Sequence, residues 1–412
     1  MKQDVLIIGG GITGVSIALK AQRKGMTCCI VDALPAASPD RTSFGNAGIL
    51  ARNAVLPTVT RSAVASLGHY MTSSKSPVSF RYRYGLKWMP WTLRSLMHIS
   101  DAEMQRISKA QDYLLFDTVE QHLALAAGTK AATMIAECDM AYLYKSEKDA
   151  RTDNQEAWVK KERGIFSKEL RAAELQQNDP HLSPEYTFAL SYPDHGWISD
   201  PGAYLSALYD SFELAGGTIH LGDVAQVTSK DAILKSGKTL SASQIVIAAG
   251  AKSVDLLRPF GVNIPMIAER GYHIHIPNSP IKPPSPYLVE GKFGLTPMQT
   301  GLRVAGTTEL SSIDAPVQNA RFDFLKRSIK DVYPQVDLSD ITTWVGHRPS
   351  LPDSMPCIGR LSKHPNIICA FGGQHLGLTM GPKVGQIVSE ILLDQPSNAD
   401  LTPYTPDRFE PV

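Results

Sequence analysis

The sequence predicts an α/β protein of two domains, one with a doubly wound parallel sheet and one with an antiparallel sheet and flanking helices. An apolar run at residues 5–8 leads at once into a glycine-rich turn and a helical pattern, which is typical of the start of a βαβ unit. A second apolar run at 245–249 ends in Gly250 and has the composition of a buried parallel strand. Residues 272–276 alternate between polar and apolar side chains, as a half-buried antiparallel strand does.

The glycines after the first strand have the spacing G-x-G-x-x-G, with members at Gly9, Gly11 and Gly14. In a dinucleotide-binding turn the first glycine permits a tight bend and the second lets a pyrophosphate approach the backbone. The third lets the helix pack closely against the strand. The helix begins near Ile12 and Thr13, so its free N–H groups and positive dipole end face the same point. We therefore predict that these five residues bind the phosphates of a dinucleotide.

The next strand supports this prediction. Residues 27–31 form an apolar run that ends in Asp32, eighteen residues beyond Gly14, where an acid can accept hydrogen bonds from a ribose 2′-OH. We therefore place Asp32 and the following Ala33 in the same site. A signal peptide over residues 5–19 is the alternative, but glycines interrupt that run and no small-residue cleavage site follows it.

Two later helices have clear end signals. Ser100 and Glu103 form a capping box that opens a helix ending at Gly128. Asp200, followed by a proline, opens a second helix that stops before a pair of glycines. The other expected elements are strands at 218–221, 224–227, 285–296 and 302–310, short strands after 340 around a glycine-rich turn at 371–379, and a final helix over about 382–393.

These elements predict a dinucleotide-binding domain that is discontinuous in sequence. We assign residues 1–60, 196–265 and 340–412 to it, and residues 61–195 and 266–339 to a substrate-binding domain. Chemistry is expected between the two, where a bound cofactor would be enclosed.

Composition limits the function classes. The chain of 412 residues is 43% hydrophobic and 20% charged, which is ordinary for a globular protein, and it has no run of eighteen apolar residues. A net charge of +1 argues against nucleic-acid binding. Five cysteines without a C-x-x-C pair predict reduced thiols and a cytoplasmic location, and we predict no metal site.

Charge is unevenly distributed along the chain. Residues 41–100 contain eight Lys or Arg and no Asp or Glu, and this stretch includes Trp88 and Trp91. Basic and aromatic residues together suit an anionic membrane surface or an electron-acceptor partner. The alternative is a solvated basic face that covers buried aromatic side chains. A peripheral position on the inner membrane is therefore a second prediction for the location.

Two further blocks identify a family. Residues 42–48 read Thr-Ser-Phe-Gly-Asn-Ala-Gly, and residues 344–359 read Trp-Val-Gly-His-Arg-Pro-Ser-Leu-Pro-Asp-Ser-Met-Pro-Cys-Ile-Gly. With the glycine motif they resemble the D-amino acid oxidase superfamily, and most of all its bacterial D-amino acid dehydrogenase and glycine oxidase branch. The resemblance covers nearly the whole chain. It implies FAD, which the glycine motif alone does not distinguish from NAD, and a Rossmann-like FAD-binding domain.

The resemblance also implies an activity and a site. The activity is oxidative deamination of a small D-amino or imino acid, with a hydride passing from Cα to flavin N5 and the electrons then passing to a quinone or another acceptor. Arg348 would hold the substrate carboxylate, since a guanidinium grips a carboxylate with two parallel bonds; a structural ion pair is the alternative. Tyr272 would line the pocket, and its phenol would meet the carboxylate or close over the substrate; an ordinary strand aromatic is the alternative. The roles of His273, His347 and His375 stay open.

Further cofactor contacts follow from the resemblance. In addition to the glycine-motif residues, these are Thr42, Ser43, Asn46, Ala47, Gly48, Val224, Gly250, Gln374, Leu376, Gly377, Leu378 and Thr379. Relatives that bind flavin covalently use positions that correspond to Gly45 and Gly346 here, so non-covalent FAD is predicted. The alternatives in function are an oxygen-using oxidase of glycine or sarcosine and the flavin subunit of a larger dehydrogenase. A tRNA-modifying enzyme is disfavoured because the chain lacks a methyltransferase domain and an overall basic charge.

Overall fold

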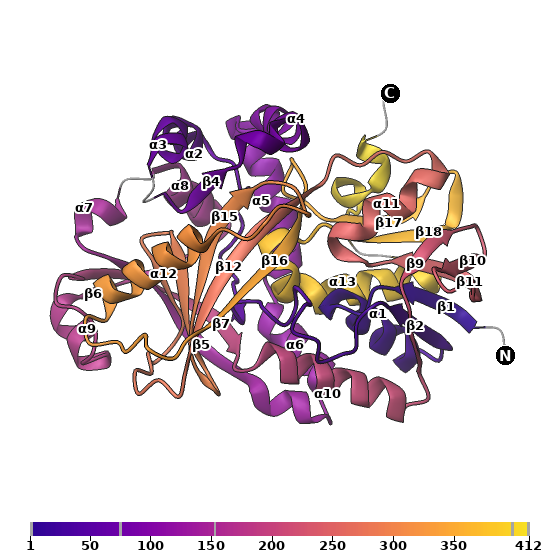
Figure 1. Cartoon of the computed structure of the whole chain (residues 1–412), viewed down its shortest axis with the longest axis horizontal. Coiled ribbons are helices and arrows are strands. Elements are labelled where there is room, and N and C mark those ends of the chain that lie inside the picture. The colour runs from indigo at the N-terminus through magenta and orange to yellow at the C-terminus, as the bar shows by residue number, and fades with distance from the viewer. Residues whose placement is uncertain (1–2, 74–75, 152–153, 397–398, 410–412) are drawn as a thin grey trace.

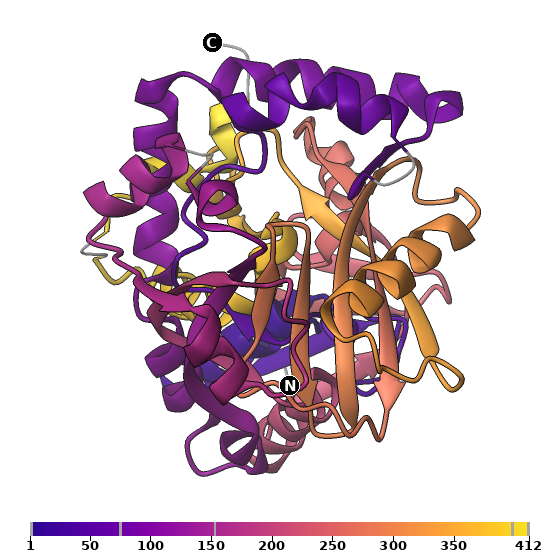
Figure 2. The ribbon, with the colours of Figure 1, turned by 90° about the vertical axis from the view of Figure 1, so that its left-hand side faces the viewer.

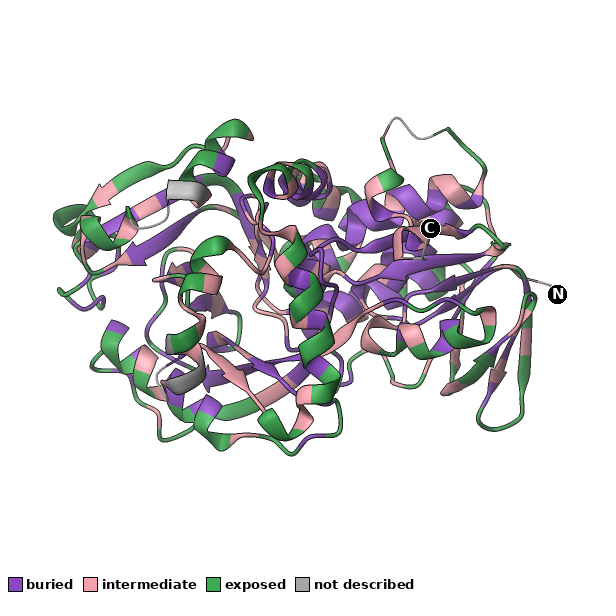
Figure 3. Cartoon of the chain, turned by 90° about the horizontal axis from the view of Figure 1, so that it is seen from above, coloured by how far each residue is buried: buried purple, intermediate pink, exposed green. Residues whose placement is uncertain are grey.

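The computed structural model describes residues 3–73, 76–151, 154–396 and 399–409. Two sheets form two lobes (Figure 1), one carrying both ends of the chain and the other built around a larger sheet. Buried residues form the inner strands of both sheets, while exposed residues lie on the surrounding helices and loops and on outer strands (Figure 3). Among the described residues, no helix combines the length and the apolar content needed to cross a bilayer.

The first sheet has the parallel core expected from the sequence. Its order is β17-β18-β11-β1-β2-β8, where β1 spans Gln3–Ile8, β2 Cys28–Asp32, β8 Thr218–Leu221, β11 Thr239–Ile247, β17 Cys357–Leu361 and β18 His364–Phe371. All neighbours pair in parallel except β17 and β18. The strand expected at 245–249 does return to the dinucleotide sheet, since Val246 lies beside Ile7. β9 (Val224–Val227) and β10 (Asp231–Leu234) extend this sheet in an antiparallel manner.

One face of this sheet is covered by helices from distant parts of the chain. These are α1 (Ile12–Arg23), α10 (Pro201–Leu214) and α13 (Gly377–Leu392), joined by α5 (Asp101–Leu115) and α6 (Thr118–Ala126). Ser100 and Asp200 cap α5 and α10 as predicted. The single helix expected up to Gly128 is wrong, because the chain breaks at residues 116–117 into α5 and α6. Both helices pack on α13, although the prediction placed them in the substrate domain.

The second sheet is larger and mostly antiparallel. Its order is β16-β12-β15-β14-β13-β5-β7-β3, where β3 spans Ile49–Leu50, β5 Ile135–Tyr144, β7 Phe188–Ile198, β12 Ile267–Pro277, β13 Tyr287–Val289, β14 Phe293–Met298, β15 Gly301–Leu310 and β16 Thr342–Ser350. β4 (Val78–Phe80) and β6 (Lys168–Arg171) are added at β15 and β7. β3 and β16 belong to this sheet, although 1–60 and 340–412 were expected in the other domain. β16 pairs with β12 from Ile267 to His275, and such long-range pairing is not encoded locally.

Smaller helices surround this sheet. They are α2 (Arg61–Ala65), α3 (Leu67–Thr72), α4 (Gly85–Ser95), α7 (Glu147–Ala150), α8 (Asn154–Glu162), α9 (Ala172–Asn178) and α12 (Asn319–Val332), while α11 (Ser253–Leu257) lies on the first lobe. α2, α3 and α4 lie along the top of the molecule (Figure 2). α12 packs against β12 and β15.

The expectation that residues 272–276 form a half-buried strand is wrong. Every residue of β12 from Glu269 to Ile276 is buried. Tyr272 and Ile274 pack in the cluster that contains α12. The opposite, polar face is covered by the other lobe, since His273 Nδ1 is 2.9 Å from the Gly45 carbonyl oxygen.

The final helix begins earlier than predicted and contains Pro382 in its interior. A proline there leaves the carbonyl of Leu378 without its helical donor. Nε2 of the buried His122 lies 2.9 Å from that oxygen and supplies the missing hydrogen bond. Burial lowers the pKa of His122 to about 4, so the ring is neutral and its Nδ1 accepts from Tyr204. A distant side chain therefore permits helix α13 to start at Gly377.

Candidate functional site

A cavity of about 380 Å³ lies between the two sheets. Its walls come from the loop after β2, from β12, β14, β15 and β16, and from the start of α13. The predicted site residues in its lining are Thr42, Asn46, Ala47, Tyr272, Arg348, Gln374, Leu376 and Thr379.

The glycine turn packs as the motif predicts. Gly9 has φ +101°, and a Cβ there would lie 2.4 Å from the carbonyl oxygen of Ala248. A Cβ on Gly14 would lie 1.9 Å from the carbonyl oxygen of Gly9. The amide of Ile12 donates to Ser43 Oγ at 3.0 Å, which ties the start of α1 to the 42–48 loop. Both Gly9 and Gly14 therefore need glycine for close backbone approach.

Asp32 is held rigidly at the end of β2. Its Oδ2 accepts from the Gly10 amide at 2.5 Å and pairs with Arg41 Nη1 at 3.0 Å. Arg41 is buried, and its Nε donates to the Pro35 carbonyl at 2.8 Å. Sequence reasoning missed this arginine, whose role is to orient the acid and the loop that follows it. A carboxylate accepts about four bonds, so Asp32 keeps capacity for a ribose hydroxyl.

Other predicted cofactor residues lie around the same strand ends. Gly250 follows β11 with φ +57°, directly after the Ala248–Ala249 backbone that Gly9 contacts. Val224 opens β9 and packs against the cluster that includes Ile8 and Val31. Ala33 is exposed just beyond Asp32. Ligands of doubly wound sheets bind at the carboxyl ends of the strands, which is where these residues gather.

The start of α13 brings a second group of predicted residues to the cavity. Gln374 adopts φ +50°, and Thr307 across the cavity adopts φ +61°. Gln374 Nε2 and Thr307 Oγ1 are buried without a hydrogen-bond partner among the described residues. Strained backbone and unpaired polar atoms in one cavity are typical of a ligand site. They fit a ligand with a polar edge, as a flavin ring system has.

Loop 42–50 is anchored to this helix start. Thr379 Oγ1 donates to the Ile49 carbonyl at 3.3 Å. Gly48, with φ +78°, donates its amide to Asn46 Oδ1 at 2.8 Å. Leu378 is buried beside Thr379, and Gly377 opens the helix. The positive end of α13 therefore faces the cavity.

Arg348 projects from β16 against Gly271 of β12. A Cβ on Gly271 would lie 2.4 Å from Arg348 Nη2, so only glycine leaves room for the guanidinium. The hydrogen bonds of the guanidinium to described residues all use Nη1, which donates to Glu269 Oε1 at 2.8 Å and to the Thr307 carbonyl at 3.2 Å, with Thr308 Oγ1 at 3.4 Å. The Nε–Nη2 edge remains available to a ligand carboxylate.

Glu269 is a site residue that sequence reasoning missed. It is buried directly opposite Arg348 in the β12–β16 ladder. Ser350 Oγ donates to its Oε2 at 3.0 Å, and Thr308 Oγ1 donates to its Oε1 at 3.1 Å. Burial raises the pKa of Glu269, but the charge and hydrogen bond of Arg348 outweigh burial, so the pKa lies below its usual value. The carboxylate is ionised and fixes the guanidinium.

The structure corrects the role expected of Tyr272. Its backbone borders the cavity, but its phenol donates to Glu309 and accepts from the Gln318 amide at 3.4 Å. The ring is 1% exposed and packs edge-on against Phe322. Burial and Glu309 raise the pKa of Tyr272 to about 12. The phenol is therefore a structural donor on the α12 side of the sheet, because strand alternation turns it there.

Of the three candidate histidines, His375 is the one that lines the cavity. Burial, followed by the charge of Arg348, lowers its pKa to about 4, so it is neutral. His273 stacks on Trp344 with 5.1 Å between ring centroids, and burial lowers its pKa to about 3. Burial also lowers the pKa of His347. None of the three provides a charge near neutral pH.

Trp344 fills the space at both positions where relatives tether flavin. A Cβ on Gly45 would lie 2.1 Å from the indole, and a Cβ on Gly346 would lie 2.0 Å from it. Trp344 Nε1 donates to the Pro39 carbonyl at 2.6 Å, which fixes the ring. Neither position has room for a longer side chain.

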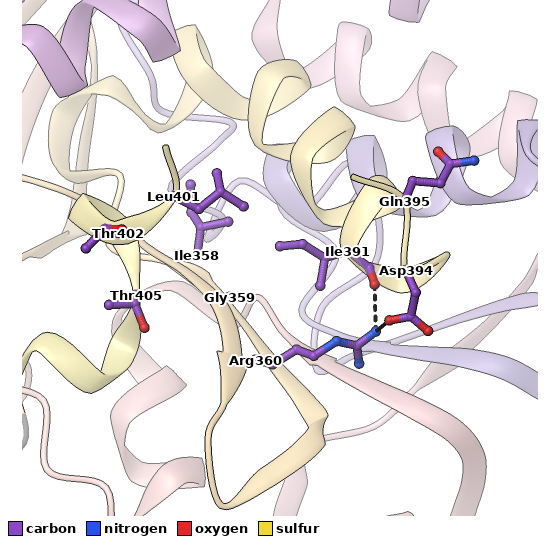
Figure 4. A pocket seen from close by; sticks show the side chains of 9 residues that line it. All are labelled: Ile358, Gly359, Arg360, Ile391, Asp394, Gln395, Leu401, Thr402 and Thr405. Carbon is purple, nitrogen blue, oxygen red and sulfur yellow. Dashed lines mark hydrogen bonds and ion pairs between the residues drawn. The ribbon is translucent and has the colours of Figure 1, made fainter. Parts of the chain in front are cut away.

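A second pocket of about 600 Å³ opens at the far end of α13 (Figure 4). Its charged groups are already paired, since Arg360 Nη2 is 2.9 Å from Asp394 Oδ1 and also donates to the Ile391 carbonyl. The α13 residues that line the two, Thr379 and Ile391, are twelve residues apart, so roughly 18 Å of helix separates this pocket from the cavity. We do not assign it to the active site.

Comparison with known proteins identifies the family. A model described as FAD dependent oxidoreductase (DAO) matches residues 4–391. The chain belongs to this family. The resemblance inferred from the sequence is therefore confirmed, and so is FAD as the cofactor of this oxidoreductase.

Individual relatives extend over the whole of this DAO-family chain. It is 30% identical to the D-amino-acid oxidase of Bradyrhizobium diazoefficiens, over 99% of both chains. It is 24% identical to a D-amino acid dehydrogenase of Helicobacter pylori, over 97% of this chain and 98% of the relative. The structure matches glycine oxidase from Geobacillus kaustophilus with a TM-score of 0.73 at 19% identity, covering 99% of each chain. This last match confirms the mixed α/β fold.

We predict that FAD is bound without a covalent link, because Gly45 and Gly346 have no reactive side chain and both contact Trp344. Acid precipitation of the purified protein should release all the yellow chromophore into the supernatant. Colour that stays with the pellet after washing would show a covalent bond and would contradict this prediction.

Proposed function

We propose that the chain is an FAD-dependent dehydrogenase that oxidatively deaminates a small D-amino or imino acid and passes the electrons to a quinone or another acceptor. The observation that carries this proposal is the open Nε–Nη2 edge of Arg348 in the interdomain cavity. The relatives named D-amino-acid oxidase and D-amino acid dehydrogenase support it.

Arg348 and Glu269 act as a unit in this proposal. Without a partner, the guanidinium of Arg348 would rotate about its flexible side chain. Glu269 fixes it through the 2.8 Å hydrogen bond to Nη1, and the Nε–Nη2 edge is left for the substrate carboxylate. The two charges cancel, so the site attracts the α-carboxylate by geometry and hydrogen bonding more than by net charge. This arrangement orients the substrate, and orientation is a large part of what an enzyme supplies to such a reaction.

FAD, when bound, supplies the redox chemistry by accepting a hydride from the carbon that carries the amine. Protein groups hold the substrate for this step. Burial lowers the pKa of His375 in the cavity to about 4, so its neutral ring is only a weak base near neutral pH, and we expect the substrate amine to lose its proton to water. The N-terminal end of α13 points the positive end of its helix dipole toward the cavity. There it would stabilise the negative charge that a bound flavin gains on reduction.

The cavity wall favours an uncharged substrate side chain. Met140, Leu288 and Phe293 line it together with the ring of Tyr142, and Lys292, which also lines it, is already paired with Glu290. Burying a charged group against these residues without a partner is costly. We therefore propose that small neutral D-amino acids react better than acidic or basic ones.

The test is an anaerobic screen of D- and L-amino acids, glycine, sarcosine and D-proline for bleaching of the flavin absorbance. Small neutral D-amino or imino acids should bleach the flavin fastest. Rapid reoxidation by a quinone analogue and slow reoxidation by air would support a dehydrogenase. No bleaching by any carboxylate-bearing amine would overturn the proposal.

An oxygen-using oxidase is the second candidate, because the Bradyrhizobium relative at 30% identity is named an oxidase. Rapid oxygen uptake with hydrogen peroxide release in the same experiment would favour it. Co-purification of a second protein in constant ratio would instead favour a flavin subunit of a larger dehydrogenase.

A further inference from the structure

Helix α4 presents an apolar stripe to solvent. Leu86, Leu93 and Met97 are 88%, 59% and 74% exposed, and Met89 beside them is 47% exposed. At 100° per residue, Leu86 and Leu93 of α4 point within about 20° of one another, and Met97 follows in the 3-10 turn Leu96–His98 that continues the helix. Single exposed apolar residues are common, but an aligned row of this kind marks an interaction surface.

The inner face of α4 is equally well defined. Trp88 and Trp91 are buried in a cluster with Leu310. Trp88 Nε1 donates to the Arg81 carbonyl at 3.1 Å, and Trp91 Nε1 donates to the Ser350 carbonyl at 3.0 Å. The two tryptophans therefore anchor the helix, and the prediction that they meet a partner is wrong. The outer stripe is not needed to attach α4 to the protein.

Basic residues flank the stripe. Arg83, in the turn before α4, and Lys87 and Arg94 on the helix are exposed, and Lys87 and Arg94 project on the same side of α4 at helical spacing. Lys87 Nζ also donates to Ser312 Oγ at 2.8 Å. The nearest acids in the sequence are already engaged, since Asp101 pairs with Arg61 and Glu103 pairs with Arg106. Other basic residues of the acid-free stretch point inward, as Arg41 and Arg52 pair with Asp32 and Asp112. The outer face of α4 is thus apolar with a basic edge.

We propose that α4 lies in the surface of an anionic lipid bilayer, with Leu86, Leu93 and Met97 inserted and Arg83, Lys87 and Arg94 at the headgroups. An apolar face with a cationic border is what an interfacial helix requires. A second copy of this chain fits less well. Two α4 helices packed antiparallel about a twofold axis would bring their Lys87 and Arg94 edges to the same side, and these like charges repel. α4 lies at the top of the molecule, so the whole enzyme can approach a flat surface on this side (Figures 1 and 2).

This position connects the surface to the active site. Trp91 of α4 bonds the backbone of Ser350, whose hydroxyl donates to Glu269, the partner of Arg348. A membrane-bound enzyme would therefore have its cavity close beneath the lipid, where a lipid-soluble electron acceptor is found. The binding itself does not depend on which substrate is oxidised.

The test is co-sedimentation of the FAD-loaded protein with vesicles of neutral phosphatidylcholine and of phosphatidylcholine mixed with phosphatidylglycerol. Binding to the anionic vesicles should be at least tenfold stronger and should weaken as salt rises, because the Debye length shrinks. The double variant Arg83→Gln/Arg94→Gln should bind roughly 30-fold more weakly, at about fivefold for each basic residue. Leu86→Gln/Leu93→Gln should weaken binding by roughly tenfold or more for each leucine.

Leu214→Gln is the matched control. Leu214 is 89% exposed and ends α10, on the opposite side of the molecule from α4 (Figure 1). This variant should bind vesicles like the parent, and all variants should keep their FAD and their turnover with a soluble dye. Equal binding to neutral and anionic vesicles, or no binding to either, would overturn the proposal. A stable dimer in light scattering that Leu86→Gln/Leu93→Gln converts to a monomer would also overturn it, because the stripe would then be a subunit interface.

Discussion

Replacing Arg348 with methionine is expected to lower kcat/KM by about 30-fold to several thousand-fold, which corresponds to losing a buried charge-assisted pair of about 2–5 kcal/mol. The guanidinium edge at Nε and Nη2 would no longer meet the substrate carboxylate. The variant should still bind FAD, because the predicted FAD-binding residues lie on other elements. Steady-state kinetics with a dye acceptor and the flavin absorbance per protein check both parts.

Two controls distinguish carboxylate binding from a general loss of structure. Arg360→Met removes an arginine that pairs with Asp394 in the second pocket, and it should leave kcat/KM nearly unchanged. An amine substrate without a carboxylate should react equally slowly with the parent and with Arg348→Met. A loss of less than about threefold in the Arg348 variant would remove this residue from the proposed role, since a pair of this kind is worth far more.

Substituting Gly14 with alanine is expected to weaken FAD binding by roughly 5- to 150-fold, the equivalent of about 1–3 kcal/mol of overpacking. The added methyl group would lie 1.9 Å from the carbonyl oxygen of Gly9, so α1 has to move away from the turn. That shift displaces the helix N-terminus from the phosphates that it is predicted to bind. The ratio of absorbance at the flavin band to that of protein, and titration of the apoprotein with FAD, measure the change.

Gly68→Ala is the matched control for this substitution. An added Cβ at Gly68 meets no described atom within 4 Å, and the residue lies in α3, away from the first sheet. Its FAD content should equal that of the parent. A Gly14→Ala protein with full FAD content and unchanged affinity would show that the glycine turn tolerates a wider spacing than the structure indicates.

The features predicted correctly from sequence depend on neighbours within a few residues. The Gly9–Gly14 turn, the capped starts of α5 and α10, and the acid at the end of β2 are local signals, because each is set by backbone geometry or by one nearby hydrogen bond. The two blocks that resemble the family, residues 42–48 and 344–359, are likewise short continuous segments that can be recognised without the structure. Arg348 could be proposed from one of them.

The predictions from sequence were wrong where a segment distant in the chain determines the local structure. Pro382 normally marks a helix boundary, but His122 compensates for the hydrogen bond that it removes. Residues 340–412 were predicted in the dinucleotide-binding domain, whereas β16 lies in the second sheet, because its pairing with β12 is a long-range choice. The tryptophans of α4 were read as a contact surface, whereas helical periodicity turns them inward and leaves the leucines outside.

By itself, the sequence determined the family, the glycine-rich turn that is predicted to bind FAD and the order of most strands and helices, since these depend on residue identity and short-range geometry. Only the tertiary structure decided what surrounds Arg348. Glu269 faces it through the register of two strands, although the two residues are 79 positions apart in sequence, and Gly271 leaves the space that the guanidinium occupies. Strand register also explains why the phenol of Tyr272 points away from the cavity. Side chains alternate along a strand, and the register determines which of them face the cavity.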